Sequence, residues 1–260
     1  MSSSTLVESA KKAAAYQAVA EHLNATTCKY VGIGSGSTVV YVVEAIAAKG
    51  VEFHKNMVFV PTGSQSKGLI RDAGLAVCQL PERPIGADGR PVTLDVAFDG
   101  ADEVDEELNC IKGGGACLLQ EKGVAIRAKK FIVVAAGVPI EVSPFFAVDI
   151  IEDLKEMGSV NPTIRSGLPA KAGECVTDNG NWIIDAPFEP LLLTKDGEKP
   201  GCWEVGALAA ALKNIEGVVE TGLFHGINGI QAEEQGKKRA QKPVAAYFGM
   251  QDGSVSVQKA

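Results

Sequence analysis

The regular alternation of short apolar runs with segments of helical periodicity restricts the fold of this chain more than any other feature. Parallel strands are short and often apolar on both faces, and each pair needs a crossover segment, usually a helix, between them. We predict strands at residues 30–33, 57–60, 75–80, 92–98 and 131–136, and helices at residues 6–23, 39–49, 121–130 and after the sequence PTGSQS. This pattern is typical of an α/β fold with a doubly wound, mostly parallel sheet.

The alternation stops after about residue 138. The sequence VTDNGNWIID places an Asn-Gly turn between two strand-like runs, which is typical of a hairpin, and a helix at residues 203–215 and a strand at 217–224 follow. We interpret residues 140–224 as a smaller α+β domain. The larger domain then comprises residues 1–139 and 225–260, and the final sequence VAAYFGMQDGSVSV returns to its sheet as two strand-like runs.

The net charge of −7 over 260 residues disfavours a nucleic-acid partner, because such proteins usually carry a basic excess that displaces counterions from phosphates. No uncharged stretch is long enough to cross a membrane, and the start MSSSTLVESAKK has no apolar run that could serve as a signal peptide. We therefore expect a cytoplasmic protein with no membrane partner. Six cysteines without CxxC spacing and three scattered histidines argue against a metal site or a redox pair.

A glycine-rich turn, GIGSGST, follows the first predicted strand and precedes a helix. Glycines let the backbone approach a ligand closely, and free amides at a helix start attract anions. The dinucleotide fingerprint is excluded because Ser37 stands where its third glycine belongs, and a Walker loop is excluded because no lysine follows. We predict an anion cradle; the alternative is a tight turn without a ligand. The candidate ligand contacts are Ser35, Gly36, Ser37 and Thr38.

An acidic segment, FDGADE, follows the predicted strand at residues 92–98. Carboxylates gathered at the carboxyl end of a strand raise one another's pKa, which favours a site that handles protons or cations. The alternative is a solvated acidic turn. The candidate site residues here are Asp99, Gly100, Ala101 and Asp102. We interpret Glu103, Asp105, Glu106 and Glu107 as structural carboxylates at a helix start.

The third motif is KGGGA, with a glutamate shortly after it. Three consecutive glycines cost conformational entropy, so we expect a use for them: a backbone bent against a ligand, with amides that can donate to a developing oxyanion. Lys112 adds positive charge there, and the glycines are Gly113, Gly114 and Gly115. Glu121 alone would be interpreted as a solvated helix residue. Its closeness to the glycine run makes it a candidate.

These motifs, in this order, resemble the ribose-5-phosphate isomerase type A family. The resemblance extends to the first helix with Lys11, to PTGSQS, to VTDNGN and to GVVETGLF, and so covers nearly the whole chain. It implies a Rossmann-like large domain with a smaller α+β domain, a homodimer or homotetramer, a small sugar-phosphate substrate, and neither a metal nor an organic cofactor.

The resemblance also implies a role for each candidate. Glu121 matches the base that moves a proton between carbon 1 and carbon 2 through an enediolate, and Asp99 matches a residue that helps to open the sugar ring. Asp102 and Lys112, with the amides of residues 113–115, match the groups that hold the two sugar oxygens. Ser35 to Thr38 match the substrate loop, with Ser37, Thr38 and Lys11 near the phosphate.

One departure and two rival functions accompany the resemblance. The family usually has an acidic residue and then a lysine after the strand matching residues 131–136, whereas this chain reads AGVPIEV and lacks the lysine. A sugar-phosphate sensor of the repressor type would use a similar cradle, but no basic helix-turn-helix precedes the first strand. An acyl-CoA transferase or an amino-sugar-phosphate deaminase would differ in activity, which an assay with ribose 5-phosphate distinguishes.

Overall fold

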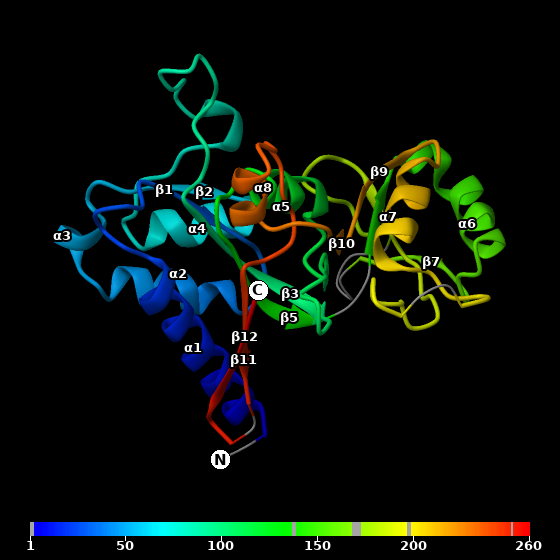
Figure 1. Ribbon diagram of the computed structural model, residues 1–260, viewed down its shortest axis with the longest axis horizontal. Coiled ribbons are helices and arrows are strands. Elements are labelled where there is room, and N and C mark those ends of the chain that lie inside the picture. Colours follow the sequence, from blue (N-terminus) through cyan, green and yellow to red (C-terminus); the bar gives the residue numbers. More distant parts are fainter. Residues whose placement is uncertain (1–2, 137–138, 168–172, 197–198, 251) are drawn as a thin grey trace.

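A large mixed sheet and a small antiparallel sheet lie side by side in the computed structural model, which describes residues 3–136, 139–167, 173–196, 199–250 and 252–260 (Figure 1). The parallel strands of the large sheet follow the order β2, β1, β3, β5 and β11, and β12 pairs antiparallel at its edge. These strands are β1 (Tyr30–Ile33), β2 (Val58–Pro61), β3 (Val96–Val104), β5 (Phe131–Ala136), β11 (Ala245–Gly249) and β12 (Val255–Lys259). Two short strands, β4 (Cys110–Ile111) and β10 (Leu223–Phe224), extend the sheet beside the end of β3.

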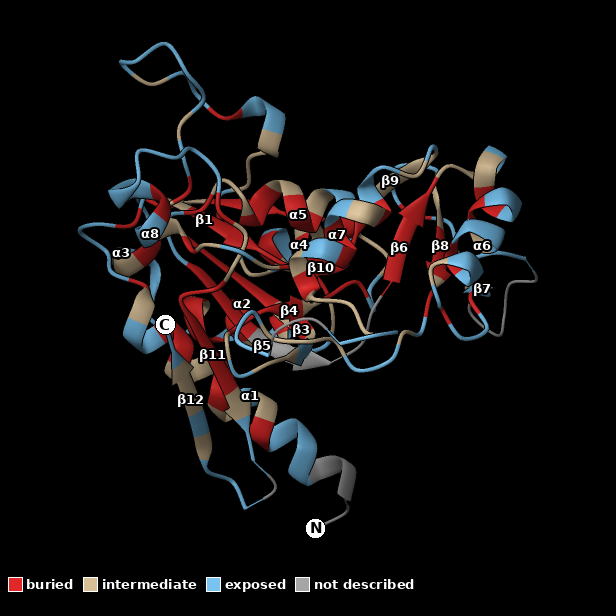
Figure 2. Ribbon diagram, turned by 45° about the vertical axis from the view of Figure 1, so that its right-hand side comes forward, coloured by how far each residue is buried: buried red, intermediate tan, exposed pale blue. Residues whose placement is uncertain are grey.

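Helices cover both faces of the large sheet because its central strands are apolar on both sides. One face packs against α1 (Ser3–His22), α2 (Val39–Ala47) and α4 (Ser64–Asp72), and the other packs against α5 (Leu118–Ala125). Figure 2 shows the central strands as the most continuously buried part of this half. The shorter helices are α3 (Val51–His54), α8 (Gly229–Glu234) and the 3-10 turn Leu80–Glu82. The predicted doubly wound α/β architecture is confirmed.

The small sheet has the strand order β7, β8, β6, β9 and packs against two helices through its own apolar core. Its elements are β6 (Pro139–Val142), the 3-10 turn Pro144–Phe146, α6 (Ala147–Glu156), β7 (Thr163–Ile164), β8 (Trp182–Asp185), α7 (Val205–Lys213) and β9 (Val218–Thr221). The chain passes from one sheet to the other at Pro139 and at Gly222, which are joined by a 2.8 Å hydrogen bond from Gly222 N to Pro139 O. The domain boundaries at 139/140 and 224/225 stay a prediction.

Several sequence predictions need correction. Residues 75–80 form no strand; one parallel bridge joins Val77 to Phe59. The predicted helix at 121–130 begins three residues earlier and ends at Ala125.

None of the helices among the described residues is long and apolar enough to span a membrane.

The acidic segment is also different from its prediction. β3 begins at Val96 and continues through Val104, so Asp99 to Glu103 lie on a strand rather than in a loop after it. Residues 103–107, all of them described, contain no helix. The reason is an Asp105 turn: the Asp105 carboxylate accepts hydrogen bonds from Glu107 N and Asn109 N, both at 2.8 Å, and the chain reverses into β4.

Candidate active site

A cavity of about 410 Å³ lies between the first glycine-rich turn, the acidic part of β3 and the glycine run. It is lined by Lys11, Ser35, Gly36, Ser37, Thr38, Gly100, Ala101, Asp102, Lys112, Gly113, Gly114, Gly115 and Glu121. The fold thus brings all the predicted site residues together, and all of them except Asp99 line the cavity. The side chain of Asp99 is not among the lining residues but is buried in direct contact with three of them, Ser35, Gly100 and Lys112.

Three charged side chains meet at the base of this cavity. Lys112 Nζ lies 3.0 Å from Asp99 Oδ2 and 3.8 Å from Glu121 Oε2, and it also donates to the carbonyl oxygen of Gly100. All three side chains are at most 3% exposed. Burial favours the neutral form of Lys112, but the charges of Asp99 and Glu121 outweigh it and raise the pKa of Lys112. The ammonium is therefore a fixed positive charge inside the site.

The two carboxyl groups beside Lys112 have different surroundings. Asp99 accepts from Ser35 N at 3.2 Å and from Gly100 N at 2.8 Å, and although burial raises its pKa, Lys112 and these amides oppose the shift. Glu121 Oε2 is buried and has no hydrogen-bond partner among the described residues. Burial raises the pKa of Glu121 to about 8, and the carboxylates of Asp99 and Asp102 add to the effect while Lys112 opposes it. Such a carboxyl group can both take up and return a proton near neutral pH.

The helix that carries Glu121 is held from the small sheet. Glu141 on β6 is completely buried, and its carboxylate accepts from Leu119 N at 2.8 Å in the first turn of α5. Thr177 Oγ1 and Asn181 Nδ2 donate to the same carboxylate at 2.9 and 2.8 Å. The predicted VTDNGN hairpin thus satisfies a buried charge at the start of α5. Glu141 was missed as a site residue, although a lone carboxylate inside the apolar run PIEV was a usable signal.

The first glycine-rich turn packs directly on Asp99. A Cβ at Gly34 would overlap the Asp99 carboxylate, so only glycine lets β1 end here with this side chain beneath it. Neighbouring side chains hold the turn: Thr62 Oγ1 lies 2.8 Å from Ser35 Oγ, and Gln65 Oε1 accepts from Gly36 N at 2.9 Å. The segment PTGSQS, to which Thr62 and Gln65 belong, therefore supports the glycine-rich turn.

Lysine 11 reaches this turn from α1. Its Nζ donates to Ser37 Oγ at 3.0 Å and to Glu8 Oε1 at 2.8 Å. Lys12 points elsewhere and pairs with Glu44 at 2.6 Å. The start of α2 and Lys11 together present hydroxyl and ammonium donors to the same end of the cavity.

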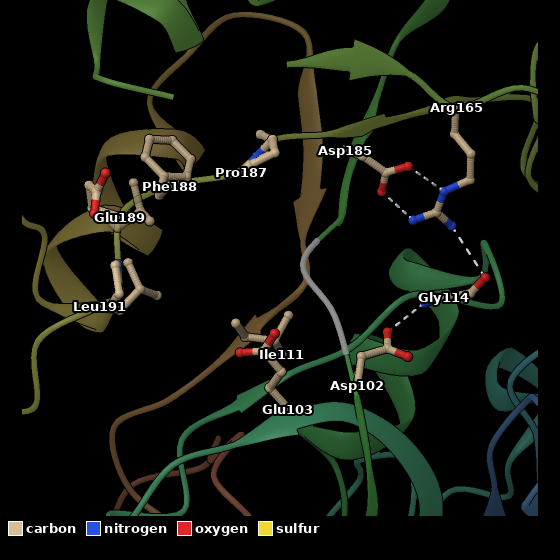
Figure 3. Close-up of a pocket in the computed structure, with 13 residues that line it drawn as sticks. Asp102, Glu103, Ile111, Gly114, Arg165, Asp185, Pro187, Phe188, Glu189 and Leu191 are labelled. Carbon is tan, nitrogen blue, oxygen red and sulfur yellow. Dashed lines mark hydrogen bonds and ion pairs between the residues drawn. The ribbon is translucent and has the colours of Figure 1, made fainter. Parts of the chain in front are cut away.

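The glycine run is held from both sides. Gly114 N donates to Asp102 Oδ2 at 2.7 Å, and the pKa of Asp102 is raised mainly by burial. On the opposite side, Arg165 Nη1 donates to the carbonyl oxygens of Gly113 and Gly114, and its guanidinium pairs with Asp185 (Figure 3). Arg165 was also missed by sequence reasoning, since nothing in its neighbourhood marks it as more than a surface arginine.

Two remaining predictions concern residues 136–142 and metals. Gly137 and Val138 lie outside the described residues, and they alone separate β5 from β6 in the sequence, so no lysine stands between these strands. In the part of the chain that the structure describes, no group of three or more His, Cys, Asp or Glu side chains is arranged to hold a metal ion.

Comparison with known proteins agrees with the geometry. Residues 58–235 match the family model of ribose 5-phosphate isomerase A (phosphoriboisomerase A). The ribose-5-phosphate isomerase of Candida albicans is 44% identical over 99% of both chains, and that of Schizosaccharomyces pombe is 43% identical over 98% of this chain and 84% of its own. A solved structure of D-ribose-5-phosphate isomerase in complex with phospho-erythronic acid superposes with a TM-score of 0.76, at 31% identity over 98% of this chain and 99% of that chain.

Proposed function

Because this chain belongs to the ribose 5-phosphate isomerase A family, we propose that Glu121 is the base of its reaction and that the surrounding cavity holds the open-chain sugar phosphate. The reaction itself is the interconversion of ribose 5-phosphate and ribulose 5-phosphate, an aldose–ketose isomerisation. The observation that carries the assignment of Glu121 is its buried Oε2, which lacks a hydrogen-bond partner among the described residues and lies 3.8 Å from a fixed ammonium.

The proton transfer follows from this arrangement. The Glu121 carboxylate removes the proton from carbon 2 of the aldose, and the electron pair of that C–H bond forms the C1–C2 double bond while the carbonyl electrons move to oxygen 1. The resulting enediolate is stabilised by the Lys112 ammonium and by the amide of Gly115 in the glycine run. The hydroxyl proton of oxygen 2 then passes to oxygen 1. The electrons left on oxygen 2 form the carbonyl at carbon 2, while the C1–C2 double-bond electrons take the proton from Glu121 at carbon 1, which completes the ketose and regenerates the Glu121 carboxylate.

The other site residues take supporting roles in this proposal. Lys11, Ser37 and Thr38 hold the phosphate, and Asp102 and Lys112 hold oxygen 1 and oxygen 2. Asp99 does not line the cavity, so we assign to it the task of keeping Lys112 charged and in place. A role of Asp99 in ring opening, which the family resemblance implies, stays a prediction that requires its action to reach the substrate through Lys112.

Replacement of the base tests the assignment directly. Glu121→Gln keeps the shape of the side chain, so we expect kcat to fall by about two to four orders of magnitude while KM for ribose 5-phosphate changes little. Glu106→Gln is the control because Glu106 lies on the surface, where it pairs with Lys195 at 3.0 Å. A folded Glu121→Gln variant with unchanged turnover would return Glu121 to a structural role.

We further propose a cytoplasmic homodimer or homotetramer, divided into domains at 139/140 and 224/225. All six cysteines are free thiols, as in proteins of a reducing compartment. Phe145, in the 3-10 turn before α6, and Val148, in the first turn of α6, are 86% and 71% exposed and offer an apolar contact for a second copy. Light scattering after size exclusion measures the number of subunits, and a monomer at micromolar concentration would contradict the proposed homo-oligomer. Cell fractionation measures the location of the protein.

A further inference from the structure

Arg165 connects the small sheet to the glycine run of the large one. It follows β7, and its backbone is fixed on both sides, because Arg165 N donates to Ile183 O and Arg165 O accepts from Cys175 N, both at 2.8 Å. The Asp185 carboxylate, at the end of β8, accepts hydrogen bonds from Arg165 Nε at 2.9 Å and from Arg165 Nη2 at 2.5 Å. This two-point pairing leaves Nη1 aimed at the glycine run, as Figure 3 shows.

The acceptors of Nη1 are the carbonyl oxygens of Gly113, at 2.9 Å, and Gly114, at 3.3 Å. Each carbonyl belongs to the same peptide group as the next amide, so Arg165 binds the two peptide groups whose N–H groups are those of Gly114 and Gly115. Gly114 N donates to Asp102, and Gly115 lines the cavity. A positive charge on the carbonyl side of a peptide group fixes its orientation and polarises its N–H into a stronger donor.

We propose that Arg165 is a positioning residue of the isomerisation: with Asp185 it aims and polarises the glycine-run amides, of which that of Gly114 holds Asp102 and that of Gly115 binds the negative charge of the enediolate. Arg165 itself lies behind the glycine run and outside the residues that line the catalytic cavity. This inference rests on the proposed function, because it assumes that the amide of Gly115 is an oxyanion donor.

The simpler alternative is that Arg165 and Asp185 only join the two sheets. A joining pair supports binding of any ligand equally, whereas a positioning residue acts selectively on negative charge at the reacting carbons. Two ligands separate these possibilities. Phospho-erythronic acid carries a carboxylate at the end where the enediolate charge develops, and erythritol 4-phosphate has the same carbon chain with a neutral hydroxymethyl group at that end.

The experiment measures the Kd of both ligands by calorimetry, and kcat and KM for ribose 5-phosphate, in Arg165→Lys. Lysine keeps the charge but cannot contact Asp185 and two carbonyls together. We expect kcat and the affinity for phospho-erythronic acid each to fall roughly ten-fold, with KM and the affinity for erythritol 4-phosphate within about three-fold of the parent. Asp185→Asn, which leaves the arginine but weakens its aim, should shift the same two quantities by a smaller factor.

Arg127→Lys is the matched control. Arg127 Nη1 also donates to a glycine carbonyl, that of Gly123 at 2.9 Å, but on the far turn of α5. We expect Arg127→Lys to bind both ligands with the same affinity as the parent protein. Equal loss of both ligands in Arg165→Lys, or no loss of either, would overturn the inference. If the parent protein itself binds the two ligands equally, the oxyanion role of the glycine amides fails, and with it the proposed assignment from which this inference starts.

Discussion

The carboxylate of Asp99 and the ammonium of Lys112 lie 3.0 Å apart although both side chains are almost completely removed from solvent. Loss of one partner of a buried pair leaves the other charge uncompensated, which costs more than the pair itself contributes. We therefore expect Asp99→Asn to lower the free energy of unfolding by about 3 kcal/mol at pH 7, together with a loss of activity. Urea unfolding at pH 7 measures the first effect, and a variant as stable as the parent would show that Lys112 does not depend on Asp99.

A different result follows for Asp102, which is half-buried and whose carboxylate, among the described residues, accepts a hydrogen bond only from Gly114 N. Asp102→Asn should reduce kcat/KM by about ten-fold or more while it changes unfolding by less than about 1 kcal/mol, since the amide oxygen can still accept from Gly114. Steady-state kinetics with Glu106→Gln in parallel provide the comparison. Equal losses in Asp102→Asn and Glu106→Gln would remove the distinction between the two carboxylates.

The activity should depend on pH through Glu121. A base must be ionised, and the pKa of Glu121 is raised to about 8 from an ordinary value of 4.5. We expect kcat/KM to rise with pH along a limb centred well above 4.5 and toward 8. An activity that is already constant from pH 5 upward would contradict a burial-shifted base at this position.

The same shift predicts how Glu121 affects stability. Between the ordinary pKa of 4.5 and the folded-state value of about 8, the folded protein holds a proton that the unfolded chain has lost. The contribution of Glu121 to stability therefore falls as the pH rises through this window. Glu121→Gln removes that loss, so we expect the variant to exceed the parent by roughly 1 kcal/mol or more at pH 8.5, seen as a Tm higher by about 2–4 °C, and to match it near pH 4.5. A parent that gains stability relative to the variant as the pH rises would reverse the sign.

Lys11 and Lys12 form a matched pair on α1. Lys11 Nζ lies 3.0 Å from Ser37 Oγ at the cavity, whereas Lys12 Nζ lies 2.6 Å from Glu44 Oε1. Because this chain has no lysine between β5 and β6, we expect Lys11→Ala to raise KM for ribose 5-phosphate by roughly ten-fold, with kcat less affected. Lys12→Ala should be nearly silent. If both variants behave alike while circular dichroism shows intact folding, the phosphate is held by other groups.

The sequence predicted the parallel sheet well because its strands are apolar and bounded by turns. β1 and β5 have the predicted bounds, and the glycine-rich turn after β1 meets the glycine run and Glu121 in one cavity. The strand conformation of the acidic segment could not be predicted in the same way. β3 pairs with β5 as far as Asp102, and this tertiary pairing overrides the local preference of Asp and Gly for a turn.

The residues that support the site were harder to find than those that line it. Glu141 and Arg165 belong to the small sheet, and their partners, Leu119 and the glycine run, lie more than twenty residues away in sequence. No spacing rule joins such pairs, because their meeting depends on how the two sheets pack. Only Glu141 is marked in the sequence, because a lone carboxylate inside the apolar run PIEV is costly to bury without partners.

The two passages between the sheets lie next to each other, at Pro139 and Gly222, and Gly222 O also accepts a 2.8 Å hydrogen bond from Lys112 N. Inserted segments whose ends are so close can often be trimmed away without harm to the parent fold. Here a chain that joined Ala136 to Gly222 would keep every residue that lines the cavity. It would lose the Glu141 carboxylate that accepts from Leu119 N at the start of α5, and the Arg165 guanidinium that donates to the glycine run. The smallest working isomerase that can be cut from this protein therefore includes both sheets.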